Sequence, residues 1–183
     1  MFLTKKYLWV VSVLFLFLAR CGETENETSG SENKEPDADY VYKVELLGQD
    51  DLQKLINQRR DRILLINVWA TWCIPCREEF PDLVQLAENY KDRQVDIVAI
   101  SADYPDEIET KIIPFLKSQQ VNFPVYVQNF ENQEDFINFL SREWSGALPA
   151  SFIYNATGEQ KLFLLGKQSY QEFADALQNE IEN

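Results

Sequence analysis

Several residue types are missing or scarce in this chain. The sequence has no histidine, one methionine and three cysteines among its 183 residues. Without histidine it cannot carry Ser-His or Cys-His catalysis, a histidine general base or the usual zinc and copper ligand sets. Bases are also scarce, since 17 Lys and Arg face 30 Asp and Glu for a net charge of -13. Such a surface disfavours nucleic acid and anionic lipid headgroups as partners. Because histidine is absent, we expect chemistry that rests on thiols and carboxylates.

The apolar run near the start of the chain is short for a membrane span. It extends from Tyr7 to Ala19, whereas a membrane-spanning helix needs about 20 apolar residues. Lys5 and Lys6 precede it, and a basic start followed by a short apolar run is typical of an export signal. We therefore predict that residues 1–21 are a signal peptide.

The end of this signal is similar to a bacterial lipoprotein cleavage site. It reads Phe17-Leu18-Ala19-Arg20-Cys21, and in such sites the cysteine becomes the lipidated N-terminus. Arg20 departs from the pattern, because a small residue normally precedes the cysteine. Ordinary cleavage nearby and an uncleaved anchor are the alternatives. Lipidation of Cys21 is favoured because it would otherwise be an unpaired thiol in an oxidising compartment.

Two further regions follow the signal. Residues 22–39 contain seven acids, one base and no apolar periodicity, so this segment is predicted to be a disordered acidic tether. Residues 40–183 alternate strand and helix patterns, which is typical of an α/β domain with a sheet between helices. The predicted strands are Val41–Leu47, Ile63–Ala70, Val95–Ser101, Pro124–Val127, Ala150–Tyr154 and Lys161–Leu165.

Helices are predicted between most of these strands. Asp50 or Asp51 is expected to cap the first, Ser169 the last, and Pro114 is expected to kink or interrupt the third. The predicted helices extend to about Arg60, from the cysteines to Tyr90, over Asp106–Gln119 and Gln133–Glu143, and from Tyr170 to about Ile181. The resulting order is βαβαβαβαββα.

Cys73 and Cys76 carry the chemistry that the sequence predicts. They stand where a buried strand meets a helix, and unpaired N–H groups at a helix start stabilise an anion, which lowers the pKa of a thiol there. Cys73 is therefore the expected attacking sulfur. Cys76, one turn later, can resolve a mixed disulfide and close the Cys73–Cys76 disulfide. Pro75 suits the first helical turn.

Two simpler explanations of this pair are weaker. Zinc needs about four ligands, and the domain has no histidine and no other cysteine. A purely structural disulfide would close a very short loop, which gives little stabilisation. No metal or cofactor is predicted.

The segment Asn67-Val68-Trp69-Ala70-Thr71-Trp72-Cys73-Ile74-Pro75-Cys76-Arg77-Glu78-Glu79-Phe80-Pro81 resembles the active-site region of TlpA and ResA-type thioredoxin-like proteins. The segment from Gly146 to Gly158 is similar to the family's cis-proline strand and the turn that follows. The resemblance runs from about Tyr40 to the C-terminus. It implies a thioredoxin fold with a central mixed sheet flanked by helices, a TlpA-type N-terminal strand and a central αβ insertion.

The resemblance also implies roles for individual residues. Pro149 would be cis, which would leave the backbone of Leu148 free to pair with an extended partner segment. Glu79 matches a family glutamate near the cysteines and would serve as general base for Cys76, although it could equally be a solvated carboxylate like Glu78. Asn67 stands where thioredoxin has an aspartate and cannot exchange a proton.

Residues around Cys73 are the expected partner-binding surface. Trp72, Ile74 and Pro75 belong to this surface, although packing alone could explain Trp72, as it could Trp144. Trp69 is expected in the core. Arg77 is most simply explained as part of a solvated face.

The predicted function is thiol-disulfide exchange. The resemblance implies a reductase in the bacterial cell envelope, anchored to the membrane, facing the periplasm and serving thiol reduction and cytochrome c maturation. Its partners would be envelope proteins with thiols or disulfides and an upstream redox donor. A peroxiredoxin-like peroxide reductase and a docking module without turnover remain as alternatives.

Overall fold

The sheet is built around a segment whose side chains are all apolar apart from one asparagine. A computed structural model of the chain describes residues 42–182. Ile63–Trp69 forms strand β2, in which every residue is buried, as expected for a strand covered on both faces. The predicted signal, Cys21 and the acidic segment lie outside the described residues, so those predictions stay untested.

Six strands form one mixed sheet in the order β1-β4-β3-β2-β5-β6. The strands β1, β4, β3 and β2 are parallel to one another, whereas β5 is antiparallel to β2 and to β6. The other strands are β1 (Val44–Leu47), β3 (Val95–Ser101), β4 (Val125–Gln128), β5 (Ala150–Tyr154) and β6 (Gln160–Leu165). This is the predicted mixed sheet: β1 is the N-terminal strand, and β4 is inserted between β1 and β3.

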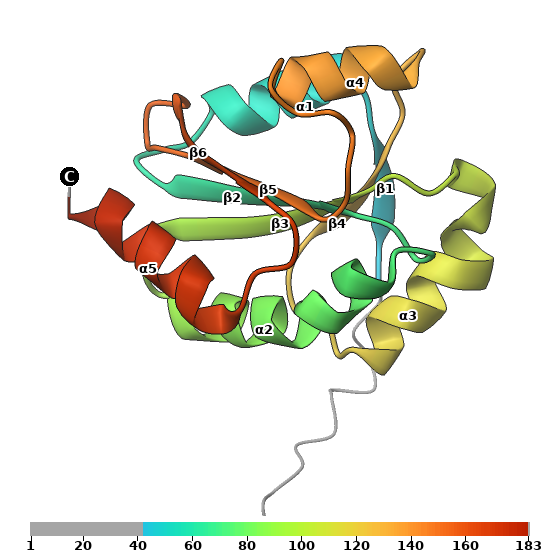
Figure 1. Cartoon of the computed structure of the whole chain (residues 1–183), viewed down its shortest axis with the longest axis horizontal. Helices are drawn as coiled ribbons and strands as arrows, with labels where there is room; N and C mark the ends of the chain where they lie inside the picture. Colours follow the sequence, from blue (N-terminus) through green and yellow to red (C-terminus); the bar gives the residue numbers. More distant parts are fainter. Residues whose placement is uncertain (1–41, 183) are drawn as a thin grey trace, which may run out of the picture. The chain divides into compact units, whose positions relative to one another are not determined.

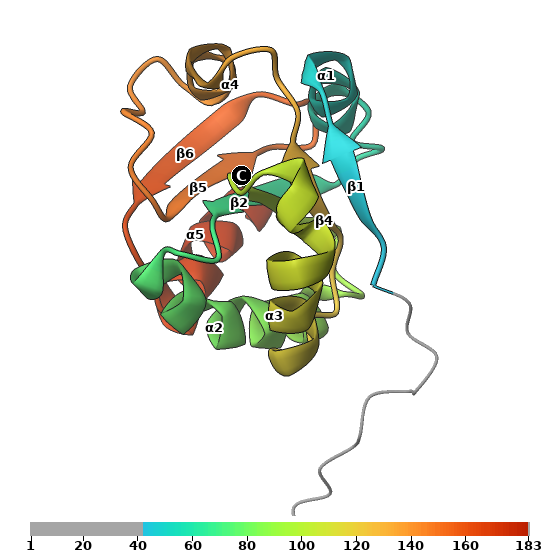
Figure 2. The ribbon, with the colours of Figure 1, turned by 90° about the vertical axis from the view of Figure 1, so that its right-hand side faces the viewer.

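Helices cover both faces of the sheet. Figure 1 shows α1 and α4 on one face and α2, α3 and α5 on the other, and the turned view agrees (Figure 2). Successive β2 residues pack alternately, with Leu65 and Trp69 toward α2 and Leu64 and Ile66 toward α1. The helices are α1 (Gln49–Asn57), α2 (Ile74–Tyr90), α3 (Ile113–Ser118), α4 (Gln133–Leu140) and α5 (Tyr170–Ile181). None of the helices in residues 42–182 combines the length and hydrophobicity of a membrane crossing.

The helix predicted over Asp106–Gln119 is broken into three pieces. A 3-10 turn, η1 (Pro105–Glu107), leads into a π-helical turn, η2 (Ile108–Ile112), and α3 follows. Pro114 lies in the first turn of α3. A proline has no N–H to donate and its ring crowds the carbonyl of the preceding turn, so the wider π turn ends where the proline begins a new helix.

Of the two predicted helix caps, one is confirmed and the other is wrong. Ser169 caps α5 as predicted, in a capping box with Glu172. The predicted aspartate cap of α1 is wrong, because Gly48 holds the cap position and no side chain bonds there. Helix α1 also ends at Asn57, short of Arg60, since Arg60 and Asp61 adopt positive φ angles of 50° and 63° that turn the chain back toward β2.

Candidate active site

Strand β2 delivers Cys73 to the start of α2. Cys73 is the N-cap of this helix, and its sulfur accepts a hydrogen bond from the backbone N–H of Cys76 at 3.3 Å. The sulfur thus takes the place that an oxygen holds in an ordinary cap. Because the positive end of the helix dipole is also here, negative charge on this sulfur is stabilised.

Cys73 and Cys76 are joined by a disulfide in the described structure. Their sulfurs are 1.97 Å apart and their Cα atoms 5.3 Å apart. Cys76 is fully buried and Cys73 nearly so. The predicted pair therefore lies within one helical turn, with Cys73 nearer the surface and Cys76 behind it.

Asp103 holds the loop that precedes Cys73, a contact that the sequence analysis missed. Its buried carboxylate accepts hydrogen bonds from the Thr71 backbone N–H at 2.8 Å and the Thr71 hydroxyl at 2.7 Å. The Ser101 hydroxyl donates a third bond at 2.6 Å. Parallel strands β2 and β3 end at the same edge of the sheet, so Ser101 at the end of β3 and Asp103 just after it were the available signal.

Glu79 is buried on the inner face of α2. One carboxylate oxygen accepts a bond from the Asn67 side-chain amide at 2.7 Å, and the other accepts one from the Gln168 backbone N–H at 2.6 Å. The Asn67 amide also donates to the Ser151 hydroxyl at 3.0 Å. The solvated alternative for Glu79 is therefore wrong, whereas it holds for Glu78, which pairs with Lys167 at the surface.

Burial changes the acidity of Glu79. Loss of solvent raises its pKa from the ordinary 4.5 to about 7, although the bonds from Gln168 and Asn67 favour the ionised form. Cys76 and Glu79 are three positions apart in α2 and both fully buried, so they share one face of the helix. A proton acceptor that titrates near neutrality thus belongs to the same helix face as the inner sulfur.

The Pro149 loop lies at the same end of the sheet as the cysteines. The peptide between Leu148 and Pro149 is cis, as the resemblance implied. Ala150, which follows, pairs with Val68 of β2, two residues before the loop that leads to Cys73. Pro149 is buried, and Leu148 is half-buried against both sides of the core.

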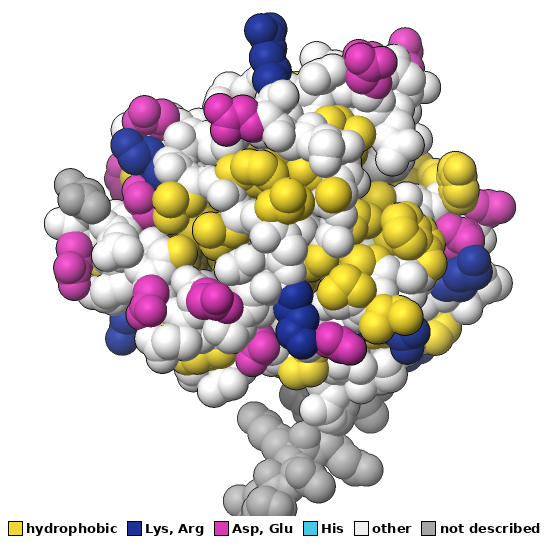
Figure 3. All heavy atoms as spheres, in the orientation of Figure 1, with side chains coloured by type: hydrophobic (Ala, Val, Ile, Leu, Met, Phe, Trp, Pro, Cys, Tyr) yellow, Lys and Arg dark blue, Asp and Glu magenta, His cyan; other side chains and the backbone are white. Residues whose placement is uncertain are grey.

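The residues that flank the disulfide are exposed. Trp72 and Ile74 have exposed fractions of 66% and 68%, and Pro75 is exposed beside them. Figure 3, in the orientation of Figure 1, shows hydrophobic side chains across the centre and right of the view, where Figure 1 places the start of α2. Trp69 is buried as predicted, and Trp144 is also core, where its ring N–H donates to the Ala147 carbonyl at 2.8 Å.

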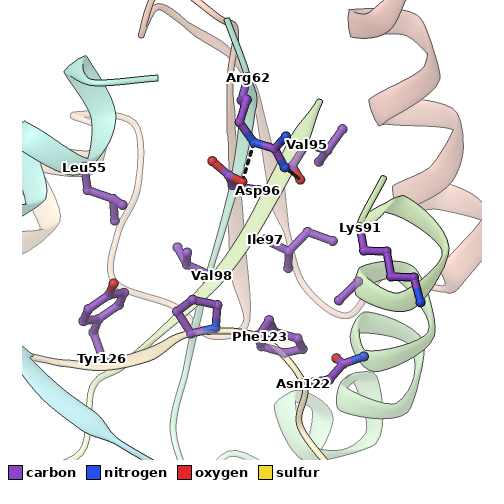
Figure 4. Close-up of a pocket in the computed structure, with 12 residues that line it drawn as sticks. Leu55, Arg62, Lys91, Val95, Asp96, Ile97, Val98, Asn122, Phe123 and Tyr126 are labelled. Atoms are coloured by element: carbon purple, nitrogen blue, oxygen red, sulfur yellow. Dashed lines mark hydrogen bonds and ion pairs between the residues drawn. The ribbon is translucent and has the colours of Figure 1, made fainter. Parts of the chain in front are cut away.

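A hollow of about 330 Å³ lies far from the cysteines (Figure 4). The first half of β3 lines it, and Arg62 and Asp96 form an ion pair at 2.7 Å on its wall. Val95 pairs with Ile63, at the opposite end of β2 from Cys73. This hollow is therefore not part of the candidate site.

Known proteins with similar sequences include a family match and a relative whose name refers to thiol-disulfide chemistry. The sequence profile of the AhpC/TSA family matches residues 39–160. A thiol-disulfide oxidoreductase ResA of Bacillus cereus is 30% identical over 115 residues, which cover 63% of this chain and 61% of that protein. The match thus spans less than two thirds of the relative's length.

Two solved structures are similar in fold. A thioredoxin-related protein from Neisseria meningitidis serogroup B is 27% identical with a TM-score of 0.57, covering 66% of this chain and 86% of that one. A thiol:disulfide interchange protein of the thioredoxin family from Chlorobium tepidum TLS has a TM-score of 0.57 at 24% identity, covering 68% and 83%. The profile match extends over both cysteines, Glu79 and Pro149, and the chain therefore belongs to the AhpC/TSA family as a ResA/TlpA-type member of the thioredoxin superfamily.

Proposed function

We propose that this protein is a thiol-disulfide oxidoreductase that reduces disulfides in partner proteins. The observation that carries the proposal is the position of Cys73, whose sulfur caps α2 and is bonded to Cys76 one turn behind it. An anionic sulfur at this position is stabilised by the Cys76 N–H and the helix dipole. The similarity to a relative named thiol-disulfide oxidoreductase supports the same activity.

The reaction starts from the dithiol form. The Cys73 thiolate attacks one sulfur of the partner's disulfide, and the partner's other sulfur leaves as a thiolate. The Cys76 thiolate then attacks Cys73, closes the intramolecular disulfide and releases the second partner thiolate. Two electrons pass to the partner, and the oxidised form that the structure describes must then be reduced by the dithiol of an upstream donor.

Glu79 is the proposed general base for the second step. Cys76 must lose a proton in a fully buried position, where the charged thiolate is disfavoured. The Glu79 carboxyl, with a pKa of about 7, is half-ionised near neutrality and accepts that proton. The Asn67 amide and the Gln168 N–H, which bond its two oxygens, hold the resulting carboxyl in place.

Partner contact and location complete the proposal. The exposed side chains of Trp72, Ile74 and Pro75 pack against the partner, and the backbone of Leu148 pairs with its extended segment. The signal-like start and Cys21 support export and membrane attachment, with lipidation of Cys21 and a periplasm-facing position. Envelope thiol reduction, including that needed in cytochrome c maturation, is the proposed role.

Insulin reduction tests the activity. Wild-type protein with a chemical reductant is expected to accelerate precipitation of reduced insulin, and Cys73→Ser protein is expected to show only the background rate. Equal rates for the two proteins would leave a docking module without turnover.

Trapping of partners tests the roles of the two cysteines. Cys76→Ser protein is expected to accumulate mixed disulfides with its partners in cells, because Cys73 still attacks but nothing resolves the product. Cys73→Ser protein is expected to accumulate none. The opposite pattern would reverse the roles assigned to the two cysteines. Export is tested separately, because removal of the first 39 residues should eliminate trapping of envelope partners.

A peroxide assay separates the remaining enzymatic alternative. A peroxiredoxin-like enzyme needs only its attacking cysteine to reduce peroxide when an external thiol resolves the oxidised form. Cys76→Ser protein incubated with peroxide and a thiol reductant is expected to show no turnover above that of Cys73→Ser. Turnover dependent on Cys73 would favour the peroxidase.

A further inference from the structure

A pair of adjoining hollows flanks the disulfide on the side of α3. The larger, of about 430 Å³, is lined by Thr71, Trp72, Arg77, Lys111, Pro114, Phe115 and Ser118. The smaller, of about 320 Å³, lies beside Ile74 and shares Arg77 and Phe115 with the first. We name these two hollows together the Arg77 groove. Figures 1 and 2 place α3 beside the first half of α2, which explains how residues from both helices line it.

The walls of the Arg77 groove belong to the segment that carries Cys73. Trp72 precedes the cysteine and Ile74 follows it, and both are among the large hydrophobic side chains exposed in the described residues. Phe115, nearly buried, packs on Trp69 and Phe80 with ring centroids 5.0 Å away in each case. Partner residues next to a cysteine bonded to Cys73 can therefore reach this groove.

Arg77 brings an uncompensated positive charge to this place. Its guanidinium lies over the Phe115 ring, 5.7 Å from the centroid, which fixes the group while its N–H donors stay available. Within residues 42–182 Arg77 forms no ion pair, and the neighbouring Glu78 pairs with Lys167 at 2.9 Å. The other base at the groove, Lys111, is already paired with Glu107.

The position of this charge contrasts with the rest of the chain. Acids outnumber bases 30 to 17, so an acidic partner gains little elsewhere on the surface. A guanidinium with free donors, placed over a ring, suits a carboxylate, which can accept two parallel bonds from it.

We propose that the Arg77 groove selects disulfides whose cysteine is flanked by an aspartate or glutamate, with Arg77 binding the acidic side chain. The inference rests on the proposed function and specifies its substrate class. While Cys73 attacks, Trp72 or Ile74 packs on the partner's backbone segment and Arg77 pairs with its carboxylate. The contact contributes to encounter and orientation and takes no part in the sulfur chemistry.

Paired disulfide peptides provide the test. The peptides form an intramolecular disulfide and differ only in a Glu, Gln or Lys directly before or after the attacked cysteine. The reduced protein is mixed with each peptide, and the single-turnover rate of thiol release is measured. Wild type is expected to reduce the Glu peptide about three- to fivefold faster than the Gln peptide at one of the two positions, as for a partly exposed charge pair.

Variants assign that preference to Arg77. Arg77→Gln is expected to bring the Glu-to-Gln rate ratio to about 1, and Arg77→Glu to invert the preference toward Lys. Ratios are compared because any change in Cys73 reactivity affects both peptides equally. Arg93→Gln is the matched control, since Arg93 also lies over an aromatic ring, that of Tyr90 at 5.1 Å, but just beyond the C-terminal end of α2. It should keep the wild-type ratio.

The outcomes separate the two proposals. Reduction of all peptides at one rate by wild type, or an unchanged ratio in Arg77→Gln, overturns the substrate preference while thiol-disulfide exchange stands. Failure of wild type to reduce any peptide overturns the proposed function itself.

Discussion

Glu79 is a carboxyl group in surroundings that oppose its charge. It is fully buried beside Asn67, and desolvation raises its pKa to about 7 despite two hydrogen bonds to its oxygens. A shift from 4.5 to about 7 corresponds to a cost on the order of 3 kcal/mol for the ionised form. Such a cost in a buried position is typical of a group with a chemical role.

The stability of the oxidised protein should reveal this cost. Glu79 contributes no pH dependence below about pH 4.5, where it is protonated in both states. As pH rises to about 7, only the unfolded state ionises, so the wild type loses stability. The Glu79→Gln protein has no carboxyl to ionise and does not suffer this loss. Its free energy of unfolding should therefore rise relative to that of wild type by on the order of 3 kcal/mol between pH 4.5 and pH 8. Urea unfolding at a series of pH values measures this difference, and Glu78→Gln is the exposed control.

The same residue should control disulfide resolution. A mixed disulfide between Cys73 and a chromogenic thiol releases the thiol when Cys76 attacks. In wild type the rate should rise with pH and level off above about 7, following ionisation of Glu79. Glu79→Gln should resolve on the order of 10²-fold more slowly near neutrality and lose this inflection. An identical pH profile in both proteins would exclude Glu79 as the base.

The loop between β2 and α2 is positioned by a neighbouring element. Its residue Thr71 gives both of its donors to Asp103, which follows β3. The loop therefore depends on a carboxylate more than thirty residues away in sequence. Because Cys73 directly follows this loop, we expect Asp103 to position the proposed attacking sulfur.

Asp103→Asn tests this dependence. The amide replaces one accepting oxygen with a donor, so at least one bond from Thr71 or Ser101 is lost in a buried position. The free energy of unfolding should fall by about 1–3 kcal/mol, and single-turnover peptide reduction should slow because Cys73 is less well oriented. Asp106→Asn, which removes an equal charge from an exposed position in η1, should leave both measurements near wild type.

Local sequence patterns predicted the helices and strands well, but they could not predict contacts between residues that are distant in the sequence. The bounds of β3, β5 and α5 match the prediction, and Ser169 caps α5 through its own neighbour Glu172. Helix α1 shows the limit, because acidic residues fill its first turn while Gly48 occupies the cap. A sequence shows which residues can cap but not which backbone angle the chain adopts there.

The candidate site divides in the same way. Cys73 and Cys76 were predictable because strand, helix and spacing are local features. The burial of Glu79 was not, since it depends on Asn67 from β2 and on the Gln168 backbone beyond β6. Asp103 escaped notice for the same reason, because only the sheet order brings the ends of β2 and β3 together.

At the scale of the whole molecule, charge governs encounter. The net charge of -13 creates a negative field that attracts cationic partners and repels anionic ones before contact. The Arg77 groove acts at shorter range, once a partner segment reaches Cys73. Long-range attraction and local selection therefore favour a partner that is basic overall but acidic beside its cysteine.

Varying the salt concentration should distinguish long-range attraction by net charge from short-range selection at the Arg77 groove. The bimolecular rate for a cationic disulfide protein should fall between about 0.01 M and about 1 M salt, as the Debye length shrinks from about 30 Å to about 3 Å. The rate for an anionic counterpart of the same fold should rise over this interval. Stopped-flow measurement with both substrates gives the two slopes, and slopes of equal sign would remove steering by net charge.

The sheet separates the chemistry from half of the core. Asn67, Glu79 and the disulfide lie on the α2 side, whereas the cluster beneath α1 and α4 is mostly aliphatic and aromatic, with Trp144 and Tyr154 carrying its polar atoms. Substitutions among the aliphatic residues of the α1 side, such as Leu52 and Leu64, should therefore act mainly through packing. On the α2 side, a substitution at Asn67 or Glu79 should alter both folding and redox behaviour. Laboratory evolution can therefore raise thermal stability through substitutions on the α1 side while catalysis is preserved.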